Sequence, residues 1–343
     1  MKKSFPLLTI AALGLAGCSV ADQAPDANDD AEASVTIMTH DSFNVPEELV
    51  TAFEEETGYS VTTTSPGDAG AVLNQLILQK DNPTVDGVYG IDNYSAETLL
   101  AEDMLTPHDA DLGSADQFTV ASDTEGHLAP IDHGQVCVNM DNEWFEAEGL
   151  APPETLEDLT DPAYEGLFVT TDPTTSSPGL AFLVATIAAT DDWQTYWHDL
   201  LDNGAKVAGG WSDAYYSDFT SAGDGDYPLV LSYLSSPSAE EGRTSSILGT
   251  CTQQVEYAGV LAEAANPDGA KAFIEFLLSS DFQETLPTEM FMYPVLDDVE
   301  LPEEWSQYAE LAEDPIAVDE AEVAENRDAW LDDWTALYEN HSS

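Results

Sequence analysis

The sequence predicts an α/β protein with two lobes. Between residues 35 and 102, apolar or β-branched segments alternate with segments of helical spacing, which is typical of strand–helix–strand units and a parallel sheet. A second set of such segments follows between residues 167 and 233. About 310 residues follow residue 34, which is long for one core, and no break in composition marks a linker. We therefore expect lobes that are joined by strands rather than by a flexible tether.

The first lobe is expected to begin with three strand–helix pairs. Leu49 and Phe53 recur at helical spacing with acidic residues between them, whereas the segment from Tyr59 to Thr64 is rich in β-branched residues. The strands are expected at residues 35–39, 59–64 and 85–91, and the helices at residues 46–57, 71–80 and 95–102.

Two apolar segments, at residues 131–140 and 255–261, are placed to cross between the lobes. They set the expected division of the chain, with lobe 1 formed by residues 35–131 and 256–343 and lobe 2 by residues 132–255. Within lobe 2, strands are expected at residues 167–171 and 229–233, and helices at residues 179–189, 193–201 and 212–221.

The chain is expected to end in a long amphipathic helix, at about residues 318–338. Trp330, Trp334, Leu337 and Tyr338 share one stripe of this helix. An aromatic stripe at helical spacing is typical of a face that packs on a core, so we expect it to be buried.

The N-terminus has the pattern of an export signal. Lys2 and Lys3 precede a short apolar run, and the run ends in Leu-Ala-Gly before Cys18. This run is too short to span a bilayer, and the order of charge, apolar residues, small residues and cysteine resembles a lipobox. We expect a signal peptide at residues 1–17, lipidation of Cys18 and an acidic tether at residues 18–34. A plain signal peptide with a chance cysteine is the alternative.

The charge of the chain excludes one class of partner. The sequence holds 67 acidic and 7 basic residues, and its formal net charge is −60. Nucleic-acid binding needs a positive surface, so no nucleic acid is expected as a partner. The acids are spread along the whole chain, whereas a protein that grips a basic partner would concentrate them in one block.

Neither the cysteines nor the known catalytic motifs indicate an enzyme or a metal site. Cys137 and Cys251 remain if Cys18 is lipidated, and they could form a disulfide or remain as two separate buried thiols. The sequence contains no spacing typical of a zinc site and no nucleophile elbow, Walker loop or HExxH helix.

Several loops after strands carry residues suited to a ligand. Gly67–Gly70 can form a nest of N–H groups, and Ser176 or Ser177 can cap a helix whose N-terminus favours an anion. Asp41 or Asp92 could balance a positive charge. Aromatic side chains that could stack on a flat or cationic ligand are Trp211, Tyr215, Tyr216, Tyr233, Phe291 and Tyr293.

The ordered combination of these segments resembles the thiamine-binding, extracytoplasmic solute receptors of ABC importers. The segments that carry the resemblance are Thr39–Phe43, Asp86–Asn93, Pro130–Gly134, Asp172–Leu180, Gly210–Tyr215, Leu229–Pro237, Pro287–Thr288 and Met292–Val295. The resemblance implies a type II periplasmic-binding-protein fold, in which two α/β lobes joined by crossing strands enclose a ligand cleft.

The resemblance also implies a set of ligand-binding residues. Asp68, Ala69, Ser176 and Ser177 fall where the family holds the hydroxyethyl or phosphate end of thiamine or its phosphates. The complete candidate set is His40, Asp41, Asp68, Ala69, Ser176, Ser177, Trp211, Tyr215, Tyr233, Leu234, Ser235, Ser236, Phe291 and Tyr293. The chain departs from the family pattern in that His40 stands where a tyrosine is common and Phe291 where a tryptophan is common.

The function implied by the resemblance is that of a receptor that delivers thiamine, or its phosphates, to an ABC permease. Such a receptor would work as a monomer, anchored by lipid to the outer face of the cell membrane, without cofactor, metal or enzymatic activity. The acidic composition resembles that of secreted proteins of halophilic archaea. The alternatives are a ferric-iron receptor of the same fold, suggested by the Tyr215-Tyr216 pair, and a secreted thiamine-processing enzyme with Cys137 as nucleophile.

Overall fold

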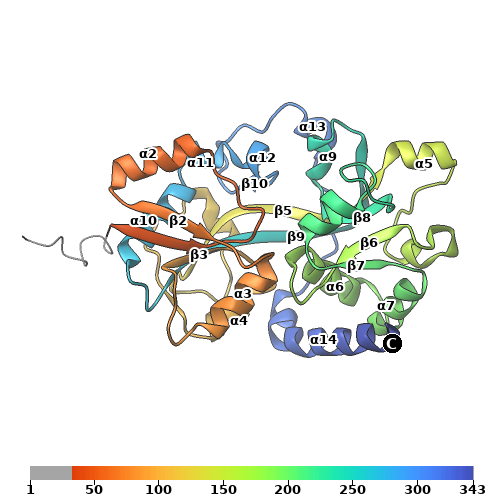
Figure 1. Ribbon diagram of the computed structural model, residues 1–343, viewed down its shortest axis with the longest axis horizontal. Helices are drawn as coiled ribbons and strands as arrows, with labels where there is room; N and C mark the ends of the chain where they lie inside the picture. The colour runs from red at the N-terminus through yellow and green to blue at the C-terminus, as the bar shows by residue number, and fades with distance from the viewer. Residues whose placement is uncertain (1–32, 343) are drawn as a thin grey trace, which may run out of the picture.

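The computed structural model describes residues 33–342, which form two lobes around one continuous sheet of strands (Figure 1). The strand order along the sheet is β2-β1-β3-β9-β5-β8-β6-β7, with β10 (Tyr293–Pro294) paired to β5 and β4 (Leu105–Thr106) paired to β9. The export signal, Cys18 and all of the acidic tether except its last two residues lie outside the described residues.

The first lobe contains the strand–helix units that the sequence predicts. Parallel strands β1 (Ser34–Met38), β2 (Ser60–Thr64) and β3 (Gly87–Asp92) alternate with helices α2 (Glu47–Thr57), α3 (Ala69–Leu78) and α4 (Ala96–Ala101). Helix α10 (Pro267–Leu277) returns to this lobe and buries Phe273 and Ile274 against Val35 and Ile37 of β1.

Two long strands run through both lobes. β5 (Leu128–Asp141) and β9 (Thr244–Leu261) pair antiparallel, from Leu128 opposite Gly259 to Asp141 opposite Thr244. The sheet is therefore mixed rather than purely parallel, because these strands cross between the lobes in opposite directions. Both crossing segments predicted from the sequence lie within these strands.

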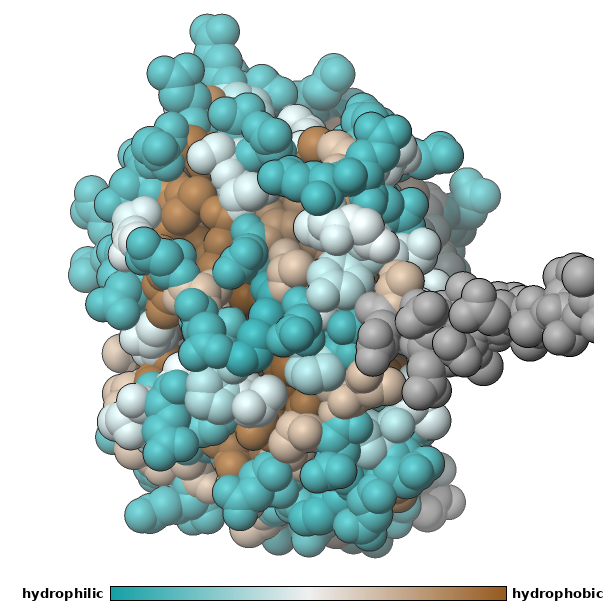
Figure 2. Space-filling model, turned by 90° about the vertical axis from the view of Figure 1, so that its left-hand side faces the viewer, coloured by the Kyte–Doolittle hydropathy of each residue, from teal (hydrophilic) through white to brown (hydrophobic). Residues whose placement is uncertain are grey.

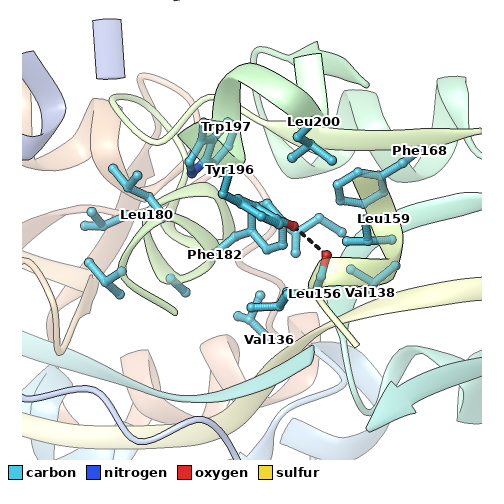
Figure 3. Close-up of a cluster of buried hydrophobic side chains, with 14 of the residues drawn as sticks. Val136, Val138, Leu156, Leu159, Phe168, Leu180, Phe182, Tyr196, Trp197 and Leu200 are labelled. Carbon is cyan, nitrogen blue, oxygen red and sulfur yellow. Dashed lines mark hydrogen bonds between the residues drawn. The ribbon is translucent and has the colours of Figure 1, made fainter. Parts of the chain in front are cut away.

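The second lobe contains parallel strands β6 (Phe168–Thr171), β7 (Lys206–Ala208) and β8 (Leu229–Tyr233) with helices α6 (Ser177–Ala189) and α7 (Trp193–Asp202). Figure 3 shows how Phe168, Phe182 and Trp197 gather between these helices and the sheet. The Tyr196 hydroxyl, buried in this cluster, donates a hydrogen bond of 2.9 Å to the Leu156 carbonyl oxygen.

The C-terminal helix differs from its expected place. Helix α14 (Glu320–His341) has the predicted buried face, with the Trp334 indole packed edge-on against Trp197 at 5.5 Å between ring centroids. Trp197 belongs to α7, so the aromatic stripe of α14 packs in the core of lobe 2, whereas the sequence analysis grouped this helix with lobe 1 (Figure 1). The first residue of α14 still contacts lobe 1, because Asn93 donates a hydrogen bond of 2.7 Å to Glu320.

The helix expected at residues 212–221 is shorter and irregular. A single turn, α8 (Trp211–Asp213), widens into a π-helical turn at Ala214–Asp218, and the backbone is extended at Phe219. The other short elements are α5 (Asn142–Glu148), α9 (Ser236–Ala239), α11 (Ser280–Gln283), α12 (Leu286–Glu289), α13 (Trp305–Tyr308) and 3-10 turns at Gly113–Phe118, Glu157–Thr160 and Pro162–Tyr164.

The structure decides between the two alternatives for the cysteines. Cys137 on β5 and Cys251 on β9 form a disulfide, with 4.2 Å between their Cα atoms. Both residues are fully buried, beside Leu234 and Trp305. The bond therefore joins the two crossing strands.

One face of the first lobe is mainly hydrophilic, with apolar patches between the hydrophilic residues (Figure 2). Among residues 33–342, no helix is both long enough and apolar enough to cross a membrane.

Candidate ligand-binding site

A cavity of about 220 Å³ lies between the lobes, at the ends of their strands. Its lining comes from loops and helix starts of both lobes and from strand β9. The lining residues are His40, Ser42, Asp68, Ser177, Trp211, Tyr215, Tyr216, Tyr233, Ser236, Ala239, Glu240, Glu256, Met290, Phe291 and Met292.

One side of the cavity is an aromatic wall formed by Trp211, Tyr215, Tyr216 and Tyr233, all from lobe 2. The rings of Trp211 and Tyr215 are stacked, with centroids 5.0 Å apart and planes 19° from parallel. The Trp211 indole N–H donates a hydrogen bond of 2.8 Å to Ser232 Oγ, which fixes the orientation of the ring. Such a wall offers fixed ring faces to a flat or cationic ligand.

The π-helical turn explains how two neighbouring tyrosines reach the aromatic wall. Tyr215 and Tyr216 are consecutive, yet both contact Trp211, with ring centroids at 5.0 and 5.3 Å. Tyr215 is buried and Tyr216 is 56% exposed, so Tyr216 forms the outer edge. π turns inserted in helices are frequent at functional sites.

A second part of the lining is a charged wall formed by His40, Asp68 and Glu256. Glu256 lies on β9, and its Oε2 is 3.3 Å from Nε2 of His40, which follows β1. Both side chains are buried. Gly90 makes room for this contact, because a Cβ at its positive φ of 93° would lie 2.3 Å from the His40 ring.

A buried network holds Glu256 in place. The Tyr89 hydroxyl is hydrogen-bonded to Glu256 Oε2 at 3.0 Å and also to Asp132 Oδ2, and Gln254 Nε2 donates to Glu256 Oε1 at 3.2 Å. Buried carboxylates are costly unless they are paired and hydrogen-bonded. The network therefore fixes the position of one carboxylate at the cavity surface.

The ionisation of this network follows from its contacts. Burial raises the pKa of Asp132 far above its usual range, and the charge of Glu256 raises it further. Burial also acts to raise the pKa of Glu256, but the charge and hydrogen bond of His40 outweigh it and lower the value. Glu256 therefore carries the negative charge of the pair, and Asp132 carries the proton.

The pKa of His40 is raised above its usual 6.5. Burial alone would lower it, but the charge of Glu256, with smaller contributions from Asp68 and Asp41, has the larger effect. His40 is thus protonated at mildly acidic pH. Among the described residues that line the cavity, it is the only basic side chain.

Asp68 links the two lobes across the cavity. It is the N-cap of α3 in lobe 1, and it accepts hydrogen bonds from the backbone N–H of Ala69 at 2.6 Å and of Trp211, in lobe 2, at 3.0 Å. Burial raises the pKa of this carboxyl group, and these donors act in the opposite direction. Within the nest predicted at Gly67–Gly70, the Ala69 N–H is therefore taken by the protein's own carboxylate.

The lobes also touch through backbone beside Asp68. The N–H of Ala71 donates a hydrogen bond of 3.2 Å to the Thr175 carbonyl oxygen. Gly70 permits this approach, since a Cβ there would lie 2.6 Å from the Thr175 carbonyl carbon. The structure thus has the lobes in contact on one side of the cavity, which is a closed arrangement.

Most residues predicted from the sequence meet at this one cavity. Those that line it are His40, Asp68, Ser177, Trp211, Tyr215, Tyr233, Ser236 and Phe291. Three segments that are far apart in the sequence, after β1, after β7 and after β8, are thereby brought together.

The other predicted residues do not line the cavity. Asp41 is exposed, and Asp92 is buried with its carboxylate bonded to the Ser95 hydroxyl and the Tyr94 N–H. Residues that lie behind the lining are Ala69, Ser176, Leu234, Ser235 and Tyr293, each of them buried.

Two of these residues support the lining from behind. The Ser235 hydroxyl donates to the carbonyl oxygen of Phe291, which has a positive φ of 55° that is unusual for an aromatic residue. Tyr293 packs its ring on Trp305 at 4.6 Å and donates to the Ala309 carbonyl oxygen. Their placement holds the segment that presents Phe291.

The most important residue that the sequence analysis missed is Glu256. Glu240, Ser42, Met290 and Met292 also line the cavity without having been predicted. Glu256 carried a signal, because it is the acid inside the otherwise apolar segment expected to cross between the lobes at residues 255–261. An acid there is costly unless it has a function or a partner.

Comparisons with known proteins agree with this geometry. The family model of bacterial extracellular solute-binding proteins matches residues 82–312. The thiamine-binding periplasmic protein of Escherichia coli K12 is 30% identical over 317 residues, covering 89% of this chain and 93% of that protein.

Solved structures show the same fold. A periplasmic thiamin binding protein superposes with a TM-score of 0.78 at 26% identity, covering 89% of this chain and 96% of the other. A ferric binding protein from Campylobacter jejuni superposes with a TM-score of 0.70 at 18% identity, covering 88% and 99%. The type II periplasmic-binding-protein fold expected from the sequence is confirmed. With two lobes, a cavity between them and a family model that matches most of its length, the chain belongs to the bacterial extracellular solute-binding proteins.

Proposed function

We propose that this protein is a receptor that binds thiamine and delivers it to an ABC permease. The observation that carries the proposal is that an aromatic wall and a buried carboxylate line the same cavity. Thiamine is a cation with two flat rings, so Trp211 and Tyr233 can stack on it while Glu256 balances its charge. The identity to a thiamine-binding protein of Escherichia coli supports the same ligand.

Binding by this protein needs no covalent step. The lobes close on the ligand as a hinge, and docking on the permease opens them again. We place the hinge where β5 and β9 pass between the lobes, near residues 131–132 and 255–256. The contact of Asp68 with the Trp211 N–H would form as the lobes close, because its two partners belong to different lobes.

The charged wall favours free thiamine over its phosphates. A phosphate group would meet Asp68, Glu240 and Glu256, and the N–H groups that could bind it already serve Asp68. No lysine or arginine is among the described residues that line the cavity. Thiamine phosphates, which the sequence resemblance left open, are therefore the weaker ligands in this proposal.

The setting of this receptor is proposed from the sequence. The receptor would be a monomer. Lipid on Cys18 would anchor it to the outer face of the membrane, and residues 18–34 would form the tether. The excess of acidic residues suits an environment of molar salt, where charge repulsion is screened within about 3 Å.

Isothermal titration calorimetry in molar salt tests the ligand. Thiamine, its monophosphate and its diphosphate are titrated in turn, with tetramethylammonium as a cation that lacks flat rings. We expect thiamine to bind best, each added phosphate to weaken binding, and tetramethylammonium to give no heat. Absence of heat and of any thermal shift with millimolar thiamine would refute the proposal.

A ferric-iron receptor is the second candidate, because Tyr215 and Tyr216 lie side by side with ring centroids 5.3 Å apart. Burial raises the pKa of both phenols, and Glu240 raises it further, so phenolate ligands are disfavoured. A red-violet band on addition of ferric citrate, lost in Tyr215→Phe, would favour iron. We expect no such band.

The enzyme alternative depended on Cys137 as a nucleophile. In the structure its sulfur is bonded to Cys251 and buried, so it offers no thiolate. Chromatography of thiamine after long incubation tests the point, and unchanged thiamine is expected.

A further inference from the structure

His40 and Glu256 form a charged pair that affects the charge balance of the cavity as well as its shape. The two side chains are 216 residues apart in the sequence, yet His40 Nε2 lies 3.3 Å from Glu256 Oε2 at the surface of the cavity. His40 is 8% and Glu256 3% exposed, so each is the main charge that the other meets. A buried carboxylate is balanced in the empty cavity by the imidazolium beside it.

The surroundings of His40 contain acids and no second base. Glu256 faces it from β9 and Asp68 from the start of α3, and Asp41 follows it in its own loop. On β3, the Tyr89 ring lies 5.4 Å from the His40 ring and connects to Asp132 on β5 through its hydroxyl. The negative charges of Glu256, Asp68 and Asp41 favour a proton on His40, so that proton is held by the surroundings of the cavity.

We infer that a cationic ligand takes the place of the His40 proton as the partner of Glu256, so that each ligand bound releases one proton. The inference rests on the proposed function, because it takes thiamine as the cation. The exchange is balanced: one monovalent cation enters the cavity, the N–H bond at the His40 ring breaks, and the proton goes to the solvent. The charge of the site is the same before and after.

The physical reason is competition for a single carboxylate. Asp132 carries a proton and is not available as a counter-charge, and Asp68 is engaged by the N–H groups of Ala69 and Trp211. An imidazolium and a ligand cation within the same small buried cavity would repel each other strongly, because few water molecules screen them. Neutral His40 no longer repels the ligand and can stack on it.

The exchange makes binding depend on pH with a definite sign. Below the pKa of His40, which is above 6.5, each binding event must remove a proton, so Kd weakens by up to about tenfold for every pH unit lost. Above that pKa the imidazole is already neutral, and Kd becomes independent of pH. The receptor would therefore bind tightly in neutral to alkaline surroundings and weakly in acid ones.

The test is calorimetric titration of thiamine into the mature protein in molar salt, at about pH 5.5 and about pH 8.5. At each pH, two buffers of different ionisation enthalpy are compared, since the difference in heat counts the protons released. We expect about one proton at the lower pH and fewer at the higher pH. Binding at the higher pH should be at least tenfold tighter.

His40→Gln is the decisive variant, because glutamine keeps a hydrogen-bond donor beside Glu256 but does not titrate. We expect it to bind thiamine with no proton release and with the same Kd at both pH values. His198→Gln, an exposed histidine on α7, is the matched control and should keep the proton release of the parent protein. Circular dichroism checks that both variants are folded.

The outcomes separate this inference from the proposed function. Thiamine binding without proton release, and with one Kd at both pH values, overturns the inference and leaves the thiamine receptor intact. Release that persists in His40→Gln assigns the proton to another group, such as Asp132, and also overturns it. Absence of thiamine binding at both pH values overturns the proposed function and the inference together.

Discussion

The two sides of the cavity are built in opposite ways. Lobe 2 supplies the aromatic wall, in which Trp211, Tyr215 and Tyr233 offer ring faces and few charges. Lobe 1 and the crossing strand β9 supply the charged wall, with His40, Asp68 and Glu256 held by hydrogen bonds. A ligand must satisfy both sides at once, which only a closed pair of lobes allows.

This difference shows which structural elements can carry each kind of ligand contact. Rings need only a stable loop, so the aromatic wall is formed by short segments after β7 and β8. A buried carboxylate needs a rigid network, and Glu256 has one because it lies within the long pairing of β5 and β9, opposite Asp132. Charge is therefore placed on a strand and ring surface on loops.

Of the substitutions considered, removal of the Trp211 indole should weaken thiamine binding most. Trp211→Ala takes away the stacked indole and is expected to weaken thiamine binding by about 30-fold, or about 2 kcal/mol. Calorimetry measures the change. Trp144→Ala removes a half-buried indole of the same lobe outside the cavity and should leave Kd unchanged. Equal losses in both variants would contradict the role of the aromatic wall.

A smaller loss of thiamine affinity is expected when a substitution keeps the two lobes apart. Gly70→Ala places a methyl group 2.6 Å from the Thr175 carbonyl carbon, so the lobes must separate. We expect about tenfold weaker binding, from about 1.4 kcal/mol of overpacking. Gly209→Ala is the control, because its Cβ meets no atom closer than 4.0 Å. Full affinity in Gly70→Ala would show that closure does not need this contact.

Two histidines in unlike surroundings, His40 and His133, sharpen the comparison without any substitution. His40 faces carboxylates, and its pKa is raised above 6.5, whereas burial between the rings of Phe118 and Tyr293 lowers the pKa of His133 to about 4. NMR titration of the ring protons should show this opposite order.

The lowered pKa of His133 also predicts that the stability of the protein depends on pH. Its pKa is lowered in the folded protein, so the unfolded chain takes up the proton first as the pH falls. The free energy of unfolding should therefore decrease between about pH 6.5 and pH 4. A His133 pKa near 6.5 would contradict the placement between the two rings.

The smallest effect is expected at the acidic surface. Asp332→Asn on the exposed face of α14 should change Kd by less than about twofold in molar salt, where the field of a surface charge is screened within about 3 Å. Glu256→Gln, by contrast, should weaken binding clearly because the carboxylate lies in the cavity. Calorimetry measures Kd for both variants, and equal losses of affinity would count against the placement of Glu256 in the binding site.

Local patterns were enough to predict most of the lobes. The β-branched and apolar segments around residues 35–102 became β1, β2 and β3 with their helices, since periodicity reports burial of one face. The helix expected at residues 212–221 was wrong in its form, because a π turn depends on packing of Tyr215 against Trp211. The place of α14 was likewise decided by contact with Trp197, which periodicity does not encode.

The candidate site likewise contains residues that the sequence could predict and residues that it could not. Trp211, Ser177 and Tyr233 could be found because residues at the ends of strands in α/β sheets face a common crevice. Glu256 could not be assigned, because its partner His40 is 216 residues away and only the pairing of β3 with β9 brings them together. The same holds for the disulfide, whose two cysteines the sequence left as either bonded or separate.

By itself the sequence determined the α/β class, the crossing strands, the excess of acid and the aromatic loops, since these follow from local composition and periodicity. Only the tertiary structure decided that Asp68 accepts a hydrogen bond from Trp211 in the other lobe, that Glu256 meets His40, and that the lobes touch at Gly70. The reason is physical: the energy of a buried charge depends on partners that are distant in the chain, and those partners are fixed only once both lobes are folded and packed.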